Sequence, residues 1–106
     1  MIASYKNISF EEAKSIIDSE SDCVILDVRE EEEYVTGHAE SAICFPLDSI
    51  NRESASQMIP DKNTAVMVYC RSGSRSLEAA EKLSSLGYGR VYNIGSLVGW
   101  PFGMEW

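Results

Sequence analysis

The feature that most constrains the fold is a set of short, nearly continuous apolar runs. Residues 23–28 read CVILDV and residues 64–69 read TAVMVY. Asp27 is the one charged residue in these two runs. Runs of this length suit strands that are buried on both faces, as in a parallel sheet covered by helices. Residues 42–45, which Pro46 stops, and residues 90–94 are also expected to be strands. The sequence therefore predicts a sheet of buried strands.

Segments with helical spacing separate these runs. Ser9 with Glu12 three residues later forms a capping box, and a helix over about residues 10–18 is predicted to follow. Residues 74–86 carry apolar side chains at helical spacing and predict another helix. Two weaker helical segments are residues 30–33 and 47–59. Strands that alternate with helices predict an α/β fold in three layers, α/β/α, around a central, mostly parallel sheet of about five strands.

The overall charge limits the classes of partner. The chain has 106 residues, enough for one domain over residues 1–106, and a net charge of −8 from nine basic and seventeen acidic residues. Nucleic acid and anionic membranes suit such a surface poorly, so neither is expected as a partner. No run approaches the ~20 apolar residues of a membrane helix. The N-terminal residues do not resemble a secretory signal, which favours the cytoplasm if the chain is not a domain cut from a longer protein.

The cysteines do not suggest a disulfide framework. There are three of them, Cys23, Cys44 and Cys70, with no C-x-x-C pair and one histidine, His38. An odd count without a secretory signal argues against disulfides, and this residue set argues against a structural metal site. Cys23 and Cys44 lie in predicted strands and are expected in the core. Cys70 differs, because it stands where the predicted strand 64–69 ends.

The loop after this strand has the features of an anion site. Residues 70–76 read CRSGSRS, and a predicted helix starts within them. Gly73 and the serines allow the backbone to curl, so that successive N–H groups point at one spot. These donors, the helix N-terminus, Arg71 and Arg75 all favour negative charge there. A thiol of ordinary pKa ~8.5 would ionise more readily in that setting, and the thiolate is the nucleophile. The alternative is a small buried cysteine before an ordinary turn, but the coincidence of these features favours a functional thiol.

Three motifs resemble those of the single-domain rhodaneses, which are sulfurtransferases. Residues 70–76 resemble the active-site loop of that family. Residues 26–38, LDVREEEEYVTGH, resemble its L-D-V-R-x-x-x-E-[FY]-x-x-G-H segment, and residues 91–95 with Trp100 resemble its closing strand and tryptophan. The order and spacing agree from about residue 8 to residue 102. Two departures are AESA at residues 39–42, where the family usually has I-P-G-A, and a serine after Gly95 in place of the second glycine of a pair.

The resemblance implies a role for each residue of the loop. Cys70 would take a sulfane sulfur from a small anionic donor such as thiosulfate, become a persulfide, and pass the sulfur to a thiophilic acceptor such as cyanide or a thiol. Arg75, and less directly Arg71, would attract and orient the donor. No metal and no organic cofactor would be needed. The substrate-binding residues implied are Arg71, Ser72, Gly73, Ser74, Arg75 and Ser76.

Other polar residues near the predicted site have two interpretations. Asp27 and Arg29 either border the pocket or hydrogen-bond the loops and each other, and the second interpretation is favoured because charged groups near a sheet end are normally paired. His38 is expected to bridge loops rather than act as a base. Trp100 and Trp106 are expected to pack the C-terminal segment, with Trp100 also at the pocket edge.

Three other functions compete with that of a small-molecule sulfurtransferase. A cysteine phosphatase of this fold is disfavoured, because four residues rather than five separate Cys70 from Arg75, and Tyr69 stands where such phosphatases have a histidine. A non-catalytic regulatory domain is disfavoured because inactive relatives typically lack the cysteine. A persulfide carrier for a specific protein donor or acceptor would use Cys70 in the same way, so this alternative stays open.

Overall fold

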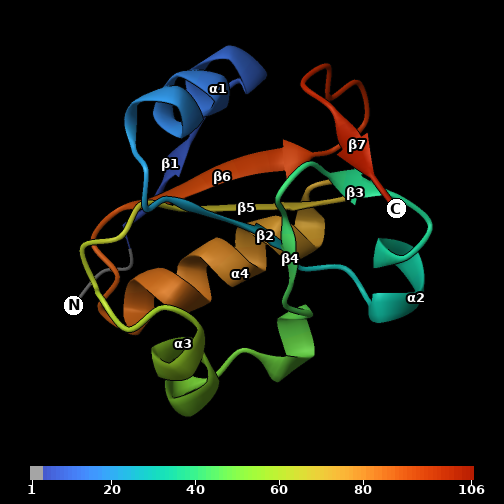
Figure 1. Cartoon of the computed structure of the whole chain (residues 1–106). Helices are drawn as coiled ribbons and strands as arrows, with labels where there is room; N and C mark the ends of the chain where they lie inside the picture. Colours follow the sequence, from blue (N-terminus) through green and yellow to red (C-terminus); the bar gives the residue numbers. More distant parts are fainter. Residues whose placement is uncertain (1–3) are drawn as a thin grey trace.

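The computed structural model describes residues 4–106, which form a central sheet with helices around it (Figure 1). The sheet has five strands in the order β1-β6-β5-β2-β4, and every neighbouring pair is parallel. The strands are β1 (Lys6–Asn7), β2 (Val24–Asp27), β4 (Ile43–Cys44), β5 (Val66–Cys70) and β6 (Val91–Ser96). The carboxyl ends of all five strands therefore meet at one edge, and the predicted central parallel sheet is confirmed.

Helices occupy most of the connections between the strands. They are α1 (Phe10–Ser19), α2 (Glu31–Tyr34), α3 (Arg52–Met58) and α4 (Ser74–Ser85), with a 3₁₀ turn η1 (Leu47–Ser49). The predicted capping box is confirmed, because Ser9 Oγ accepts from the Glu12 N–H at 3.1 Å and the Glu12 carboxylate accepts from the Ser9 N–H at 2.9 Å. The weak helical segment 47–59 divides in two, since Asn51 Oδ1 accepts from the Ser54 N–H at 2.9 Å and starts α3 there.

The predicted strands are present, with shifted ends. The expected strand 42–45 is reduced to β4 at the sheet edge, and the expected strand 90–94 continues through Gly95 as β6. The pairing of β5 with β6 shifts between Val68 and Tyr69, which places Tyr69 opposite Gly95. Three two-residue strands were not predicted, because segments so short carry no periodicity: β1, β3 (His38–Ala39) and β7 (Met104–Glu105).

The core lies in two layers, one on each face of the sheet. Helices α3 and α4 cover one face, and α1 lies on the opposite side (Figure 1). Alternate residues of β2 and β5 enter opposite layers, as strand geometry requires. The α4 side includes Leu26, Val28, Ile59, Val66, Val68, Cys70 and Leu83, and the α1 side includes Ala13, Ile25, Met67, Tyr69 and Ile94. The predicted three-layer α/β/α arrangement is therefore confirmed.

The C-terminal segment returns to the sheet through β7, which pairs antiparallel with β3. Trp100 packs edge to face against Phe10 and Phe102, with ring centroids 5.3 and 5.2 Å apart, so it does pack this segment as expected. The same expectation for Trp106 is wrong, because its surface is 84% exposed. Trp106 directly follows the two-residue strand β7 (Met104–Glu105), and most of its side chain faces solvent.

Candidate active site

Cys70 is the last residue of β5 and lies at the carboxyl edge of the sheet. The residue is fully buried on the α4 side, with 0% of its surface exposed. Its Sγ accepts hydrogen bonds from the backbone N–H of Gly73 at 2.9 Å and of Ser76 at 3.4 Å. The predicted loop therefore turns its N–H groups toward the sulfur, which is the arrangement that stabilises a thiolate.

The loop can curl this tightly because of Gly73. Its φ of +102° lies in the left-handed region, where a residue with a Cβ is strained. Gly73 is the N-cap of α4, so the positive end of the helix dipole points at the same place. The Ser76 hydroxyl donates to the Gly73 carbonyl at 3.0 Å and braces the turn from inside. Ser72 and Ser74 lie on the exposed side of the loop.

The surroundings of Cys70 favour its ionised form. Burial by itself raises the pKa of the thiol, but the N–H groups of Ser76, Gly73 and Ser72, together with the Ser76 hydroxyl, outweigh it, so the pKa falls below the ordinary value. Cys23 and Cys44 show the opposite result, because burial raises the pKa of both thiols and nearby carboxylates add to the effect. The chain therefore contains one activated cysteine and two unactivated ones.

This contrast predicts the pH dependence of alkylation. A lowered pKa keeps more thiolate at a given pH. As the pH is raised, we therefore expect the rate of alkylation by iodoacetamide to reach its midpoint at a lower pH for Cys70 than for Cys23 and Cys44. The midpoint of each pH–rate profile is the readout, because limited access of the reagent to a buried thiol lowers the alkylation rate at every pH and leaves the midpoint at the pKa of that thiol. Mass spectrometry of the separate cysteine peptides over a pH series provides the measurement. Three coincident midpoints would contradict the assignment of Cys70 as the activated thiol.

The two arginines of the loop are in different electrostatic situations. Arg75 forms a two-pronged ion pair with Glu33 of α2, with nitrogen–oxygen distances of 2.6 and 3.0 Å. The guanidinium hydrogen bonds hold the pKa of Glu33 down at about 2, so the pair stays charged at neutral pH. Arg71 is exposed and forms no ion pair within residues 4–106. The free positive charge beside Cys70 is therefore on Arg71, whereas the sequence led us to emphasise Arg75.

Asp27 and Arg29 form a buried pair at the end of β2, as the favoured interpretation expected. The Arg29 guanidinium donates to both Asp27 oxygens, at 2.6–3.1 Å, and to the Gly37 carbonyl at 2.7 Å. The Tyr69 hydroxyl donates to Asp27 at 2.7 Å and accepts from the Ala39 N–H at 3.0 Å. This network ties together β2, β5 and the segment before β4. His38 stacks on the Tyr34 ring at 3.8 Å with Nδ1 3.0 Å from the Tyr34 carbonyl oxygen, which also fits a structural role.

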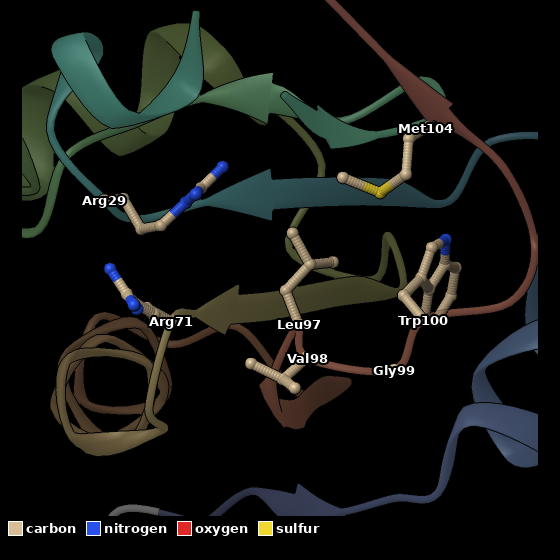
Figure 2. Close-up of a pocket in the computed structure, with 7 residues that line it drawn as sticks. All are labelled: Arg29, Arg71, Leu97, Val98, Gly99, Trp100 and Met104. Atoms are coloured by element: carbon tan, nitrogen blue, oxygen red, sulfur yellow. The ribbon is translucent and has the colours of Figure 1, made fainter. Parts of the chain in front are cut away.

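A pocket of about 360 Å³ opens next to the cysteine loop. Figure 2 shows Arg29 and Arg71 at one end, where β2 and β5 stop, and Trp100 and Met104 at the other. Trp100 thus reaches the pocket edge, as expected. Its lining residues are Arg29, Arg71, Leu97, Val98, Gly99, Trp100 and Met104.

Two contacts that the sequence did not indicate connect this pocket to the loop. The Leu97 N–H donates to the Cys70 carbonyl at 2.9 Å, and the Ser96 hydroxyl donates to the Arg71 carbonyl at 2.6 Å. The pairing of Arg75 with Glu33 was also missed, although the two motifs carry opposite charges, with glutamates at 30–33 and arginines at 71 and 75. No signal in the sequence pointed to Leu97 or Met104.

Comparisons with known proteins point to one family. A family model described as the rhodanese-like domain matches residues 9–101. The chain belongs to the rhodanese-like domain family. Thiosulfate sulfurtransferase PspE of Escherichia coli strain K12 is 43% identical over 72 residues, which make up 68% of each chain. A solved structure described as an E. coli rhodanese with anions is 38% identical and has a TM-score of 0.72, over 77% of this chain and 95% of that one.

A further relative of this rhodanese-like chain is named differently. The putative sulfur carrier protein YrkF of Bacillus subtilis strain 168 is 34% identical over 92 residues, which make up 87% of this chain and 48% of that protein. The rhodanese-like chain thus spans about half the length of YrkF.

The prediction of a sulfurtransferase-type enzyme is confirmed by the relatives that bear this name. Within residues 4–106, no helix of this rhodanese-like chain is long and apolar enough to cross a membrane.

One departure of this rhodanese-like chain from the family pattern lies in a turn with left-handed backbone conformation. Ser41 stands where the family usually has the glycine of I-P-G-A, and its φ is +69°. This left-handed conformation is one that glycine adopts with less strain than serine. The Ser41 N–H donates to the Glu105 carboxylate at 3.0 Å, so β7 helps to hold the turn. The departure therefore lies in the loop before β4, outside the cysteine loop.

Proposed function

We propose that this chain transfers a sulfane sulfur from a small anionic donor to a thiophilic acceptor through a persulfide on Cys70. The observation that carries the proposal is the buried Sγ that accepts from the N–H groups of Gly73 and Ser76 and has a lowered pKa. A thiolate held in this way is both a nucleophile and a place where a persulfide anion is stabilised without reorganisation of the loop.

The chemistry balances without a cofactor or an external oxidant. The Cys70 thiolate attacks the outer sulfur of thiosulfate, the sulfur–sulfur bond of the donor breaks, and sulfite leaves with the electron pair. Cys70 then carries the persulfide anion. A thiophile such as cyanide or a thiolate attacks the terminal sulfur and restores the thiolate. Two half-reactions on one enzyme thiol imply ping-pong kinetics.

Arg71 is the residue that we assign to attracting the anionic donor. Its guanidinium is exposed, lines the pocket and has no acidic partner within the described residues, so its charge acts on an approaching anion. Arg75 is assigned a positioning role, because its two-pronged pair with Glu33 fixes the first turn of α4 against α2. Ser72 and Ser76 contribute backbone N–H groups beside the sulfur, the Ser76 hydroxyl braces the turn, and Ser74 is the first residue of α4.

A persulfide carrier for a protein partner is the second candidate, and the resemblance to the putative sulfur carrier protein YrkF favours it. A carrier would form the same persulfide and release it to a protein thiol. A phosphatase gains no support, because the arginine that would hold the phosphate, Arg75, is paired with Glu33. A non-catalytic domain gains none either, because the cysteine and its N–H donors are in place.

The mass of the intact protein after incubation with thiosulfate tests the proposal. We expect the reduced protein to gain the mass of one sulfur atom and to lose it on addition of cyanide. Peptide mapping should place the added sulfur on Cys70. If reduced, folded protein gains no sulfur from thiosulfate or from a polysulfide, the proposed transfer is wrong. A gain from polysulfide alone would support the carrier.

A further inference from the structure

Ser96 is the last residue of β6 and lies beside the cysteine loop. In the register of the sheet it is the partner of Cys70, the last residue of β5. Its hydroxyl donates to the Arg71 carbonyl at 2.6 Å and accepts from the Val98 N–H at 3.1 Å. A hydroxyl has one proton to donate, and the Val98 N–H occupies a lone pair of the oxygen. The proton is therefore directed at the Arg71 carbonyl, and the bond joins the first residue of the loop to β6.

The Arg71 carbonyl and the Ser72 N–H belong to one peptide group. This peptide bond is trans, and in a planar trans peptide the C=O and the N–H point in opposite directions. The Ser96 hydroxyl holds the carbonyl on the side of β6. The Ser72 N–H consequently lies on the other side, where it acts on the Cys70 thiol and helps to lower its pKa.

The other two N–H donors to Cys70 are secured by α4. Ser76 lies within the helix, and Gly73, its N-cap, has a carbonyl that accepts from the Ser76 hydroxyl at 3.0 Å and from the Leu77 N–H at 3.1 Å. The peptide group between Arg71 and Ser72 precedes the helix. Among residues 4–106, Ser96 is the one hydrogen-bond donor to its carbonyl. Rotation of this peptide would turn the N–H away from the sulfur and a carbonyl oxygen toward it.

From these observations we infer that Ser96 is a positioning residue for sulfur transfer, whose hydroxyl fixes the peptide group between Arg71 and Ser72 with its N–H toward Cys70. Ser96 does not touch the reacting sulfur and acts through this peptide. In its bearing on sulfur transfer, the inference rests on the proposed function. Serine stands here in place of the second glycine of the family's pair, and glycine has no side chain to form this bond.

Ser96→Ala tests the inference through the pH dependence of Cys70 alkylation by iodoacetamide. Without the hydroxyl the peptide is free to rotate, so the thiolate loses a donor and the profile should move to higher pH. On the rising part of the profile we expect the rate at a given pH to fall about threefold or more. The plateau rate at high pH should stay within about twofold, because the thiol is then fully ionised in both proteins. Ser96→Thr keeps the hydroxyl and should restore the original profile.

Ser49→Ala is the matched control. The Ser49 hydroxyl also donates to a backbone carbonyl, that of Pro46 at 2.7 Å, but it lies in η1, outside the cysteine loop. Its removal should leave the Cys70 profile unchanged. Equal displacements of the profile in Ser49→Ala and Ser96→Ala would overturn the inference. A lower plateau with an unchanged midpoint in Ser96→Ala would overturn it as well, because it would mean that the hydroxyl only supports the turn at residues 96–98.

Nuclear magnetic resonance provides a direct readout of the peptide group. In the unmodified protein the amide proton signals of Ser72 and Gly73 should both move as Cys70 ionises, because both N–H groups face the sulfur. In Ser96→Ala the movement of the Ser72 signal should fall by at least about half, while the Gly73 signal keeps its movement as an internal reference. Undiminished movement of the Ser72 signal would overturn the inference.

Persulfide formation separates this inference from the proposed function. At a pH on the rising part of the alkylation profile, Ser96→Ala should gain one sulfur atom from thiosulfate more slowly, by about the same factor as its alkylation. A displaced alkylation profile with no sulfur gain in any variant would support the positioning role and contradict the proposed function. Sulfur gain with identical alkylation profiles in Ser96→Ala and the unmodified protein would overturn the positioning role and leave the proposed function standing.

Discussion

Replacing Cys70 by serine is expected to lower the sulfur-transfer rate by at least about a thousandfold, because the nucleophile and the persulfide carrier are lost together. Serine keeps the size of the buried side chain and an acceptor for the N–H groups of Gly73 and Ser76, so the loop should stay folded. Steady-state transfer from thiosulfate to cyanide, with circular dichroism as a check of folding, provides the measurement.

Cys23→Ser and Cys44→Ser are the matched controls for this prediction. Both thiols are partly buried, and the pKa of each is raised by burial, so neither is activated. We expect each variant to retain transfer within about threefold of the unmodified protein. Equal losses in all three variants would show that the effect of Cys70→Ser comes from damage to the fold and would contradict its catalytic assignment.

The largest expected effect on stability comes from Asp27→Ala. The Asp27 carboxylate has no exposed surface and accepts hydrogen bonds from the Arg29 guanidinium and the Tyr69 hydroxyl. Removing it leaves the guanidinium of Arg29 buried without its counter-charge, which costs about 3–5 kcal/mol of the free energy of unfolding. Since a domain of this size has roughly 5–15 kcal/mol in total, the loss is a large fraction of its stability. Urea denaturation measures the free energy of unfolding directly.

Asp18→Ala makes the same substitution in an exposed ion pair. The Asp18 carboxylate lies 3.0 Å from Lys14 Nζ, four residues earlier in α1, and both side chains are largely exposed. Its removal should cost no more than about 0.5 kcal/mol. The double variant Asp27→Ala, Arg29→Met should recover part of the loss of Asp27→Ala, because the unpaired charge is then gone. Similar losses for Asp27→Ala and Asp18→Ala would show that the buried network does not stabilise the fold as argued.

Local patterns in the sequence were sufficient for four of the five strands of the central sheet and for the cysteine loop. Apolar runs such as 64–69 identify buried strands because burial on both faces leaves few places for polar side chains. The position of Cys70 followed from the end of that run, and the curl of the loop followed from Gly73, whose φ is indeed positive. These features depend on residues close together in the chain, so no tertiary information was needed to predict them.

Long-range pairing decided the electrostatics of the site. Arg75 and Glu33 are 42 residues apart, and only the tertiary fold brings their side chains to 2.6 Å. That pairing neutralises Arg75 and leaves Arg71 as the unpaired cation of the loop. It therefore changes which arginine we expect to attract the donor. The hydrogen bonds of the Tyr69 hydroxyl with Asp27 and with the Ala39 N–H likewise join three segments that are separate in the sequence.

By itself the sequence determined the α/β class, the thiol at the end of β5 and the N–H donors around it, because apolar runs, glycine conformation and helix capping depend on residues close together in the chain. Only the tertiary structure decided which charges are neutralised and where the apolar pocket lies. The 97–104 segment has no marked periodicity, and its place beside Cys70 comes from the pairing of β7 with β3 and from the Leu97–Cys70 hydrogen bond. Contacts of that kind depend on how the whole chain folds back on itself, so no local pattern encodes them.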